Sequence, residues 1–386
     1  GLTPERIPAH RVLTPGLPLL ADWGDAAHTE QVARIERERE TGALGPWNGG
    51  IEAPALRAWL AGARGPDYHW SPTQLEAYAK CPWAYFSGRL LGLEQRAEPE
   101  DEMDAVTRGT ILHRALQLVY EGLAQDRGGP VLLRESELAA LTPRVEEALD
   151  AAIAALPPEV WLGHPALRVT RRQEMLELLE GYLAWEASEI EVSFDSKSRK
   201  HAARRVRTVV QAHEVTFRDI TLERGEIRFR FRGRIDRVEV GCDQRLPSDQ
   251  FVAAVDYKTG KGSTPGGGDA RAWGDGVVLQ LPLYAHALAQ LHPGRAVSRV
   301  EYRAIRGREV VHSLNLHQVD KTRREATLDP AAQEKLDAAL TRAAQHVAAV
   351  RRGEFPAAPP PSCDCPDWCH GFDICRVPGG PRRRTW

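Results

Sequence analysis

The chain has 386 residues, 42% of them hydrophobic, which is enough for a large buried core and favours one large domain with smaller extensions. The formal net charge of −2 excludes a protein that is basic as a whole, so any contact with a nucleic acid has to come from local patches. The sequence has neither a run of about eighteen apolar residues nor a signal-peptide pattern, so we expect a cytoplasmic protein that does not contact membranes.

The beginning of the chain differs in pattern from the rest. Residues 1–70 are interrupted by proline and glycine and contain one charged helical stretch, Thr29–Glu40, so we expect a connecting arm. From 71 to 386 the pattern is that of a folded domain. The segment Ser71-Pro72-Thr73 has the features of a helix start. We expect one helix there, with an apolar side formed by Leu75, Tyr78, Tyr85 and Phe86.

Helical segments come first in this domain, and strands follow. Apolar spacing predicts a helix over Ala105–Leu123 and further helices within 131–192, and we expect residues from about 125 to 207 to form a helical insertion. From β-rich composition we predict strands at His213–Phe217, Ile227–Val240, Phe251–Val255 and Val297–Ile305. Two later helices are predicted at Val277–Gln290, after a glycine-rich loop, and at Ala331–Arg352.

Two acidic motifs stand at or near the ends of predicted strands. Asp236 lies in Gly233-Arg234-Ile235-Asp236-Arg237, and Asp256 lies in Asp256-Tyr257-Lys258-Thr259-Gly260. Neighbouring strands would bring both carboxylates to one edge of a sheet, with Lys258 on the same face as Asp256 because side chains alternate. Asp236, Asp256 and the carbonyl oxygen of Tyr257 would suit Mg²⁺, while Lys258 would orient a water and offset charge on a phosphodiester. Carboxylates at strand ends are also common as solvated turn residues, so spacing alone leaves both interpretations open.

Three further side chains bear on that choice. His113 lies on the helix predicted before the sheet, where a histidine is either a ligand or a buried core residue. Gln280 and Tyr284 are four positions apart and share one face of a predicted helix, either as active-site residues or as ordinary polar positions. The order along the chain is therefore His, Gly-x-Ile-Asp-Arg, Asp-x-Lys-Thr-Gly and Gln-x-x-x-Tyr.

That order resembles the PD-(D/E)XK nuclease superfamily, in particular the RecB-like branch found in bacterial helicase–nucleases. The segments Ser71-Pro72-Thr73-Gln74-Leu75-Glu76, Cys81-Pro82-Trp83 and Leu91-Gly92-Leu93 also look like the entry segment of that branch. The resemblance covers most of the chain, 71–376. Ile235 stands where the superfamily's name has a proline, and this form is usual in the branch.

The resemblance implies an α/β fold with a restriction-endonuclease-like core, in which helices flank a central mixed sheet. It implies a metal-dependent deoxyribonuclease that hydrolyses phosphodiester bonds. It also implies roles for individual residues, with Mg²⁺ or Mn²⁺ held by His113, Asp236 and Asp256, Lys258 as the catalytic lysine, and Gln280 and Tyr284 as residues that position substrate.

The cysteines indicate a second cofactor. Four of the six lie within thirteen residues, in a tail spanning 363–375, and such a cluster in an intracellular chain favours zinc or an iron–sulfur cluster over disulfides. The resemblance implies a 4Fe–4S cluster, because AddB-type chains of helicase–nucleases hold one with an early cysteine and a Cys-x2-Cys-x5-Cys tail. Pro366 stands at the first tail position, so we assign Cys365 there, with Cys363 as the alternate. The predicted ligands, which would staple the two ends of the domain together, are Cys81, Cys365, Cys369 and Cys375.

The expected substrate is DNA, and because we find no base-reading motif we expect cutting that does not depend on sequence, on single strands delivered by a helicase. The chain begins with Gly1 rather than methionine and has no Walker-type ATPase motif, so we expect a helicase subunit, or the helicase portion of a longer chain, as partner. The expected role is double-strand-break end processing and recombinational repair at the nucleoid. Basic residues that would track phosphates, or form a solvated helix face, are Lys197, Arg199, Lys200, Arg204, Arg205, Arg207 and Arg382–Arg384.

Two other functions stay open. The first is a non-catalytic scaffold that binds DNA ends. The complete His–Asp–Asp–Lys set argues against it. The second is a CRISPR-adaptation-type iron–sulfur nuclease, against which the long arm at 1–70 and the large insertion speak.

Overall fold

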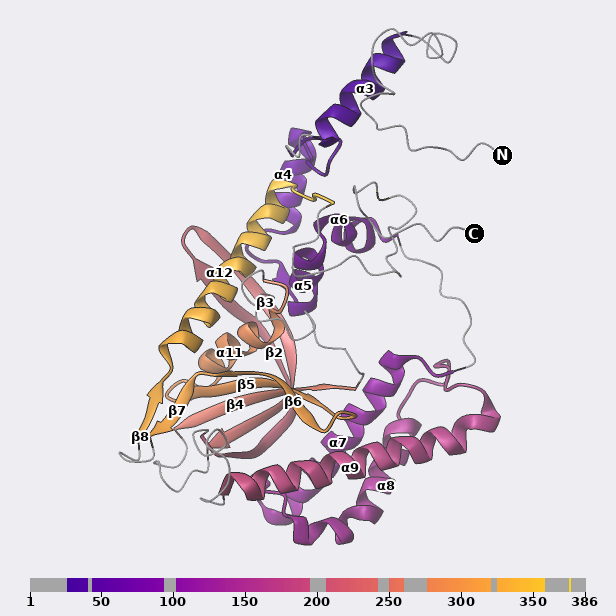
Figure 1. Cartoon of the computed structure of the whole chain (residues 1–386), viewed down its shortest axis with the longest axis vertical. Helices are drawn as coiled ribbons and strands as arrows, with labels where there is room; N and C mark the ends of the chain where they lie inside the picture. The colour runs from indigo at the N-terminus through magenta and orange to yellow at the C-terminus, as the bar shows by residue number, and fades with distance from the viewer. Residues whose placement is uncertain are drawn as a thin grey trace, which may run out of the picture.

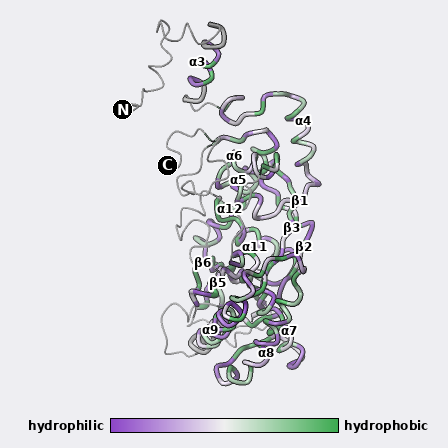
Figure 2. Tube along the Cα trace, turned by 90° about the vertical axis from the view of Figure 1, so that its right-hand side faces the viewer, coloured by the Kyte–Doolittle hydropathy of each residue, from purple (hydrophilic) through white to green (hydrophobic). Residues whose placement is uncertain are grey.

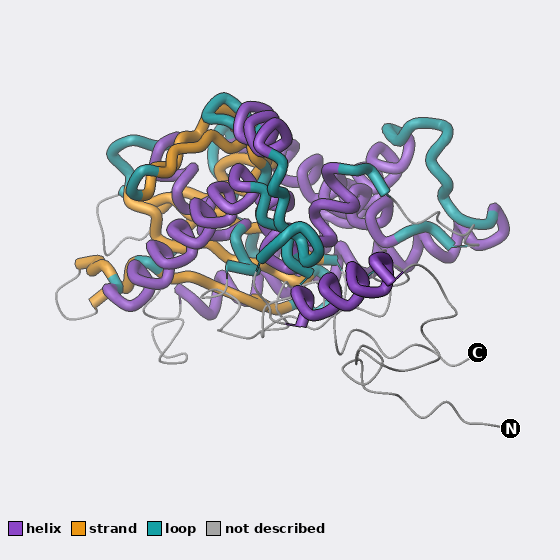
Figure 3. The backbone as a smooth tube through the Cα atoms, turned by 90° about the horizontal axis from the view of Figure 1, so that it is seen from above, coloured by secondary structure: helices purple, strands orange, loops and turns teal. Residues whose placement is uncertain are grey.

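A mixed β-sheet lies between two groups of helices in the computed structural model of the chain (Figure 1). The structure describes residues 26–40, 44–93, 102–194, 206–241, 250–259, 276–320, 325–357 and 375. Figure 3 shows the same arrangement from above, with helices on both sides of the strands. The predicted α/β class with a central mixed sheet is confirmed.

The main sheet has six strands, in the order β1-β3-β4-β5-β6, with β2 also paired to β3. Its strands are β1 (His69–Trp70), β2 (Thr208–Arg224), β3 (Ile227–Gly241), β4 (Phe251–Lys258), β5 (Ala296–Ala304) and β6 (Glu309–Asn315). The pairs β1–β3 and β4–β5 are parallel, and the others are antiparallel. A separate hairpin is formed by β7 (His317–Asp320) and β8 (Glu325–Leu328).

The helices fall into two groups according to the core that they share with the sheet. The first group comprises α4 (Pro54–Ala63), α5 (Pro72–Lys80), α6 (Pro82–Tyr85), α11 (Gln280–Leu291) and α12 (Pro330–Arg352). The second group comprises α7 (Ala105–Arg127), α8 (Leu138–Ala154) and α9 (Arg168–Phe194). A further helix, α3 (Ala26–Glu40), includes the predicted stretch Thr29–Glu40.

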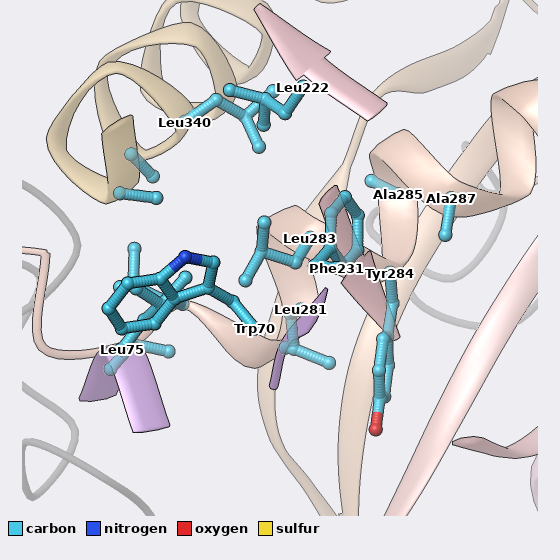
Figure 4. Packing of buried hydrophobic residues seen from close by; sticks show 14 of the residues in the cluster. Trp70, Leu75, Leu222, Phe231, Leu281, Leu283, Tyr284, Ala285, Ala287 and Leu340 are labelled. Atoms are coloured by element: carbon cyan, nitrogen blue, oxygen red, sulfur yellow. The ribbon is translucent and has the colours of Figure 1, made fainter. Parts of the chain in front are cut away.

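The larger core lies between the sheet and the first group of helices. Figure 4 shows Trp70, Leu75 and Leu283 packed together, joining β1, α5 and α11. In Figure 2 hydrophobic and hydrophilic stretches are interleaved in the region of the sheet and α11. β4, in which all residues but Lys258 are buried, has the continuous apolar run expected of a strand covered on both faces. The crossover between the parallel strands β4 and β5 runs through α11, which is therefore fixed directly over the sheet.

The entry segment forms two short helices where one helix was predicted. Ser71 does cap α5, and its side chain accepts the N–H of Gln74, as the sequence indicates. Cys81, however, is extended, with φ of −164° and ψ of 107°, so it ends α5 and precedes α6. The cause is Pro82, because a residue before proline is sterically excluded from the helical region.

Residues 44–70, predicted to belong to an arm, pack against the end of α12. The N–H of Ile51 donates to the carbonyl oxygen of Gly353 over 2.8 Å, and Gly50 forms a bridge with Glu354. Leu60 of α4 is buried in the larger core. Gly353 ends α12 with φ of 76°, a left-handed conformation that glycine adopts without steric cost. The predicted domain boundary at 70 stays a prediction.

Candidate active site

Asp236 and Asp256 lie side by side on paired strands. β3 and β4 run antiparallel, and Arg237 faces Val255 in the register, so the two aspartates are adjacent at the end of this pairing. Asp236 Oδ2 accepts the backbone N–H of Tyr257 over 2.8 Å. Both side chains are buried, Asp236 being 7% and Asp256 2% exposed. The geometric expectation that neighbouring strands bring these carboxylates together therefore holds.

Lys258 and Gln280 complete a hydrogen-bonded group around Asp256. Lys258 Nζ forms an ion pair with Asp256 Oδ2 and donates to Gln280 Oε1 over 3.0 Å. Gln280 Nε2 donates to Asp256 Oδ1 over 2.5 Å. The Lys258 ammonium also lies 4.4 Å from the centre of the Tyr302 ring, a favourable cation–π distance. Lysine, aspartate and glutamine thus hold each other in fixed orientations.

His113 and Tyr284 reach the same site from helices on opposite faces of the sheet. His113 Nδ1 lies 3.4 Å from Asp236 Oδ2. The Tyr284 hydroxyl accepts from Gln280 Nε2 over 2.9 Å and donates to the carbonyl oxygen of Arg234 over 2.6 Å. Figure 4 shows this hydroxyl at the margin of the larger core. All six predicted side chains are therefore within one connected site, whereas Tyr257, predicted through its carbonyl oxygen, turns its own side chain into the core beneath α7 and α9.

Burial changes the protonation of the site's acids and of its imidazole. Burial raises the pKa of Asp236 to about 6, against a lowering by the N–H of Tyr257. Burial, reinforced by the charge of Asp236, also raises the pKa of Asp256 to about 6. The pKa of His113 is lowered by burial, so its imidazole is neutral near pH 7 and has a nitrogen lone pair to offer.

Glu214 is a member of the site that the sequence motifs did not indicate. One ligand atom each from His113, Glu214 and Asp236 lie within 4.8 Å of one another, a spacing that could hold a metal ion. Glu214 has φ of 53°, which is uncommon for a residue other than glycine and often marks a functional constraint. Its Oε2 also lies 2.6 Å from Arg234 Nε, whose side chain is 62% exposed at the rim.

Gly233, the first residue of the Gly-x-Ile-Asp motif, is required by packing. A Cβ atom at this position would lie 2.6 Å from Cζ of Phe217, a buried ring on the paired strand β2. Any larger residue would have to displace that ring. The glycine therefore allows β2 and β3 to pair closely beside Asp236.

A network of buried charges lies beneath the site, on the face covered by α7 and α9. Arg237, the residue after Asp236, pairs with Glu186 of α9 over 2.5 Å and with Glu239. Arg237 Nη1 also donates to the hydroxyl of Tyr257, the residue after Asp256, over 3.2 Å. Arg303, Arg299 and Glu301 extend the network along β5. On the face covered by α7 and α9, Arg237 thus links the two strands that carry the aspartates to each other and to α9.

The predicted cysteine cluster is described only in part. Cys363, Cys365 and Cys369 lie outside the described residues, as do Lys197, Arg199, Lys200, Arg204, Arg205 and Arg382–Arg384. Cys81 is half-buried between α5 and α6, and its Sγ accepts the N–H of Ala84 over 3.4 Å. The N–H of Trp83 donates to the carbonyl oxygen of Pro356 over 3.3 Å, so Cys81 lies close to the point where the chain leaves α12 towards the tail.

The fold and the Asp–Asp–Lys arrangement define a class of metal-dependent nucleases. A model of the PD-(D/E)XK nuclease superfamily matches residues 69–376, and the chain belongs to this family. The predicted enzyme class is therefore confirmed. Within the described part of the chain, every helix is too short or too polar to span a bilayer.

Two curated relatives are named as the B component of an ATP-dependent helicase/deoxyribonuclease. The protein from Moorella thermoacetica is 29% identical over 241 residues, 58% of this chain and 18% of the relative. The protein from Symbiobacterium thermophilum is 30% identical over 245 residues, 59% of this chain and 18% of the relative. The predicted branch of helicase–nucleases is confirmed by these matches, and the matched region spans less than a fifth of either relative.

Proposed function

We propose that this chain hydrolyses phosphodiester bonds of DNA with a divalent metal ion bound beside Asp236 and Asp256. The observation that carries the proposal is the single hydrogen-bonded group formed by Lys258, Asp256 and Gln280, directly next to Asp236 and His113. A scaffold that only binds DNA would have no need for two buried aspartates, whose burial is energetically unfavourable, with a half-buried lysine paired to one of them.

The side chains present fit a divalent ion with mostly oxygen ligands. His113, Glu214 and Asp236 offer atoms within 4.8 Å of one another, and Asp256 borders them. Carboxylate oxygens with one imidazole nitrogen suit Mg²⁺ or Mn²⁺. We assign His113, Asp236 and Asp256 as ligands, with the Tyr257 carbonyl oxygen and Glu214 as further candidates. A bound ion would lower the pKa of a water and offset negative charge on the phosphate.

The protein's own groups would orient the reactants. The ammonium group of Lys258 lies between Asp256 and Gln280, where it could donate a hydrogen bond to an attacking water or to a phosphate oxygen. Gln280 keeps this ammonium in place from above, and Tyr284 in turn fixes Gln280 through the hydrogen bond between their side chains. Arg234, exposed at the rim, adds a positive charge where a DNA backbone would approach.

The names of the relatives support DNA as substrate and a helicase as partner. We infer that the chain is the nuclease part of such a helicase–nuclease, acting on single strands during double-strand-break end processing and recombinational repair at the nucleoid. The relatives favour this role over that of a CRISPR-adaptation nuclease.

The proposal is tested by incubating the purified chain with an end-labelled single-stranded oligonucleotide. We expect shortened products with Mg²⁺ or Mn²⁺ and none after chelation with EDTA, because the ion is needed to offset the negative charge that develops on the phosphate during hydrolysis. A matched duplex, expected to be cut more slowly, serves as the comparison for strand preference. Binding of the oligonucleotide without cleavage in any divalent ion would instead support the DNA-end scaffold.

The 4Fe–4S cluster is a separate part of the proposal, with Cys81, Cys365, Cys369 and Cys375 as ligands and Cys363 as the alternate for Cys365. The contact between Trp83 and Pro356 supports it, because it brings Cys81 close to Pro356, which precedes the cysteine-rich tail along the chain. A cluster there would link residues nearly three hundred positions apart, and its role would be structural.

Replacing Cys81 with alanine is expected to remove most of the iron and to lower the unfolding temperature and the affinity for DNA, without directly removing the catalytic group. Iron and zinc content, visible absorbance and thermal unfolding are the measurements. Cys242→Ala, outside the predicted ligand set, is the control and should keep its iron. One zinc and no iron in the wild-type chain would refute the cluster.

A further inference from the structure

The helix that carries Gln280 begins without a cap of its own. Leu279, the residue before α11, makes no side-chain hydrogen bond to the first turn. The first N–H groups of a helix have no partner within the helix and need an acceptor elsewhere. That acceptor is Glu76 of α5, whose Oε1 receives the N–H groups of Leu279 and Gln280, both over 2.8 Å. A residue about two hundred positions away therefore caps α11.

Glu76 is held firmly where it stands. It is only 5% exposed, and its neighbour Leu75 packs with Leu281 and Leu283 of α11 around Trp70 (Figure 4). Burying a carboxylate is unfavourable unless hydrogen bonds and the positive end of a helix dipole compensate, and both are present here. The two helices are thus joined by apolar packing and by a charge-assisted contact at the first turn of α11.

Gln280 is the first residue of that turn and is bonded on both sides of its amide group. Its Oε1 accepts from Lys258 over 3.0 Å and from the Tyr302 hydroxyl over 3.2 Å. Its Nε2 donates to Asp256 over 2.5 Å and to Tyr284 over 2.9 Å. A small rotation of the first turn of α11 would therefore move the partner of both the lysine and the aspartate.

We infer that Glu76 is a positioning residue of the nuclease: it fixes the first turn of α11 and so holds Gln280 against Asp256 and Lys258. The inference rests on the proposed function, because it assigns Glu76 a part in that same site. Glu76 does not touch the reacting groups and acts only through Gln280. A purely structural cap would stabilise the fold without changing the rate per folded molecule.

The test compares Glu76→Met, which keeps the size but removes the acceptor, with Glu76→Gln, which keeps an acceptor oxygen. We expect Glu76→Met to lower kcat by about 10- to 100-fold with KM nearly unchanged, as for other residues that orient a catalytic group. Glu76→Gln should restore most of the rate. Tyr78→Phe, which removes a hydrogen bond from the same helix to the carbonyl oxygen of Glu354, is the control and should keep the wild-type kcat.

A double-mutant cycle with Gln280→Ala separates positioning from stability. If Glu76 acts through Gln280, adding Glu76→Met to Gln280→Ala should not lower kcat further. If the two residues act independently, the fold-losses in kcat would multiply. Backbone hydrogen exchange gives a readout that does not need activity: amides at 279–284 should exchange faster in Glu76→Met and not in Glu76→Gln. Unchanged exchange and unchanged kcat in Glu76→Met, or multiplied losses in the double variant, would overturn the inference. If the wild-type chain never cleaves DNA but the amides at 279–284 still exchange faster in Glu76→Met than in the wild type, the proposed function alone would be refuted.

Discussion

Replacing Asp256 with asparagine is expected to lower the rate of metal-dependent DNA cleavage by about 10³-fold or more, since the lost charge is worth several kcal/mol in the transition state. Asparagine keeps the shape of the side chain and a carbonyl oxygen that can still accept from Gln280. The loss would therefore report the missing carboxylate rather than a collapsed site. The measurement is the single-turnover rate of oligonucleotide cleavage at saturating metal.

The same change is expected to stabilise the metal-free protein. Burial and the charge of Asp236 raise the pKa of Asp256 from its ordinary value of 3.8 to about 6. The folded protein therefore binds this proton more tightly than the unfolded chain does. Stability falls as the pH rises between these two values, and the full cost, roughly 1–3 kcal/mol, is present above pH 6. Asparagine avoids that cost because it carries no charge at any pH.

Thermal unfolding of the two proteins across pH isolates this effect. The unfolding temperatures should coincide below pH 4, and Asp256→Asn should unfold at a higher temperature above pH 6. Added Mg²⁺ should stabilise the wild type more than the variant, because only the former keeps the carboxylate that we propose as a ligand. Asp67→Asn, with a side chain that is 91% exposed, is the control for both measurements. Full cleavage activity in Asp256→Asn would contradict the assignment of the site.

Local rules of side-chain alternation and helix spacing predicted which side chains of the site share a face, and the family resemblance then joined them into one site. Asp256 and Lys258 share a face because they are two apart on β4, and Gln280 and Tyr284 share a face because they are four apart on α11. The pairing of β3 with β4 is non-local, but the two strands follow each other along the chain. The packing of α7 and α11 that brings His113 and Gln280 to these strands is a tertiary contact that local rules do not give.

Glu214 could not be predicted in the same way, because its place depends on an irregularity of the β2–β3 hairpin. The pairing shifts between Phe217 and Ile220, where Phe217 faces Gly233 and Ile220 faces Phe231. Without that extra residue Val215 would stand opposite Asp236, and Glu214 would point to the other face of the sheet. Asp219, in the shifted stretch, has φ of 58°, and no motif in the sequence announces it.

The role of Glu76 could not be predicted from the sequence for a different reason. It was visible in the entry segment as part of a family resemblance, but its partner is the first turn of a helix about two hundred residues later. The sequence also predicted that helix to begin at Val277, three residues before its observed start at Gln280. A hydrogen bond to the end of a remote helix follows from tertiary packing alone, which no local pattern records.

Replacing Arg237 with methionine is expected to destabilise the fold by about 3–5 kcal/mol, because it removes one partner from a buried ionic network. Arg237, Arg299 and Arg303 face Glu186, Glu239 and Glu301, so the charges balance among these six side chains. Methionine fills a similar volume but leaves one negative charge uncompensated in the interior. The free energy of unfolding in urea is the measurement.

An exposed ion pair provides the matched control. Arg172 of α9 binds Asp150 of α8 through two hydrogen bonds of 2.6 and 2.8 Å, with the two side chains 32% and 56% exposed. Arg172→Met should cost less than about 1 kcal/mol, because water solvates the remaining carboxylate. Equal losses in Arg172→Met and Arg237→Met would contradict the special role of burial.

A second replacement distinguishes the uncompensated charge from lost packing as the source of the cost. Glu186 is the carboxylate that Arg237 shares with Arg303, so Arg237→Met combined with Glu186→Gln restores the balance of charge. If unpaired charge dominates, the double variant should be more stable than Arg237→Met alone. If packing dominates, the second change should lower stability further. Recovery would show that Arg237, the arginine that follows Asp236 in the motif, is needed to neutralise the interior behind the strands that carry Asp236 and Asp256.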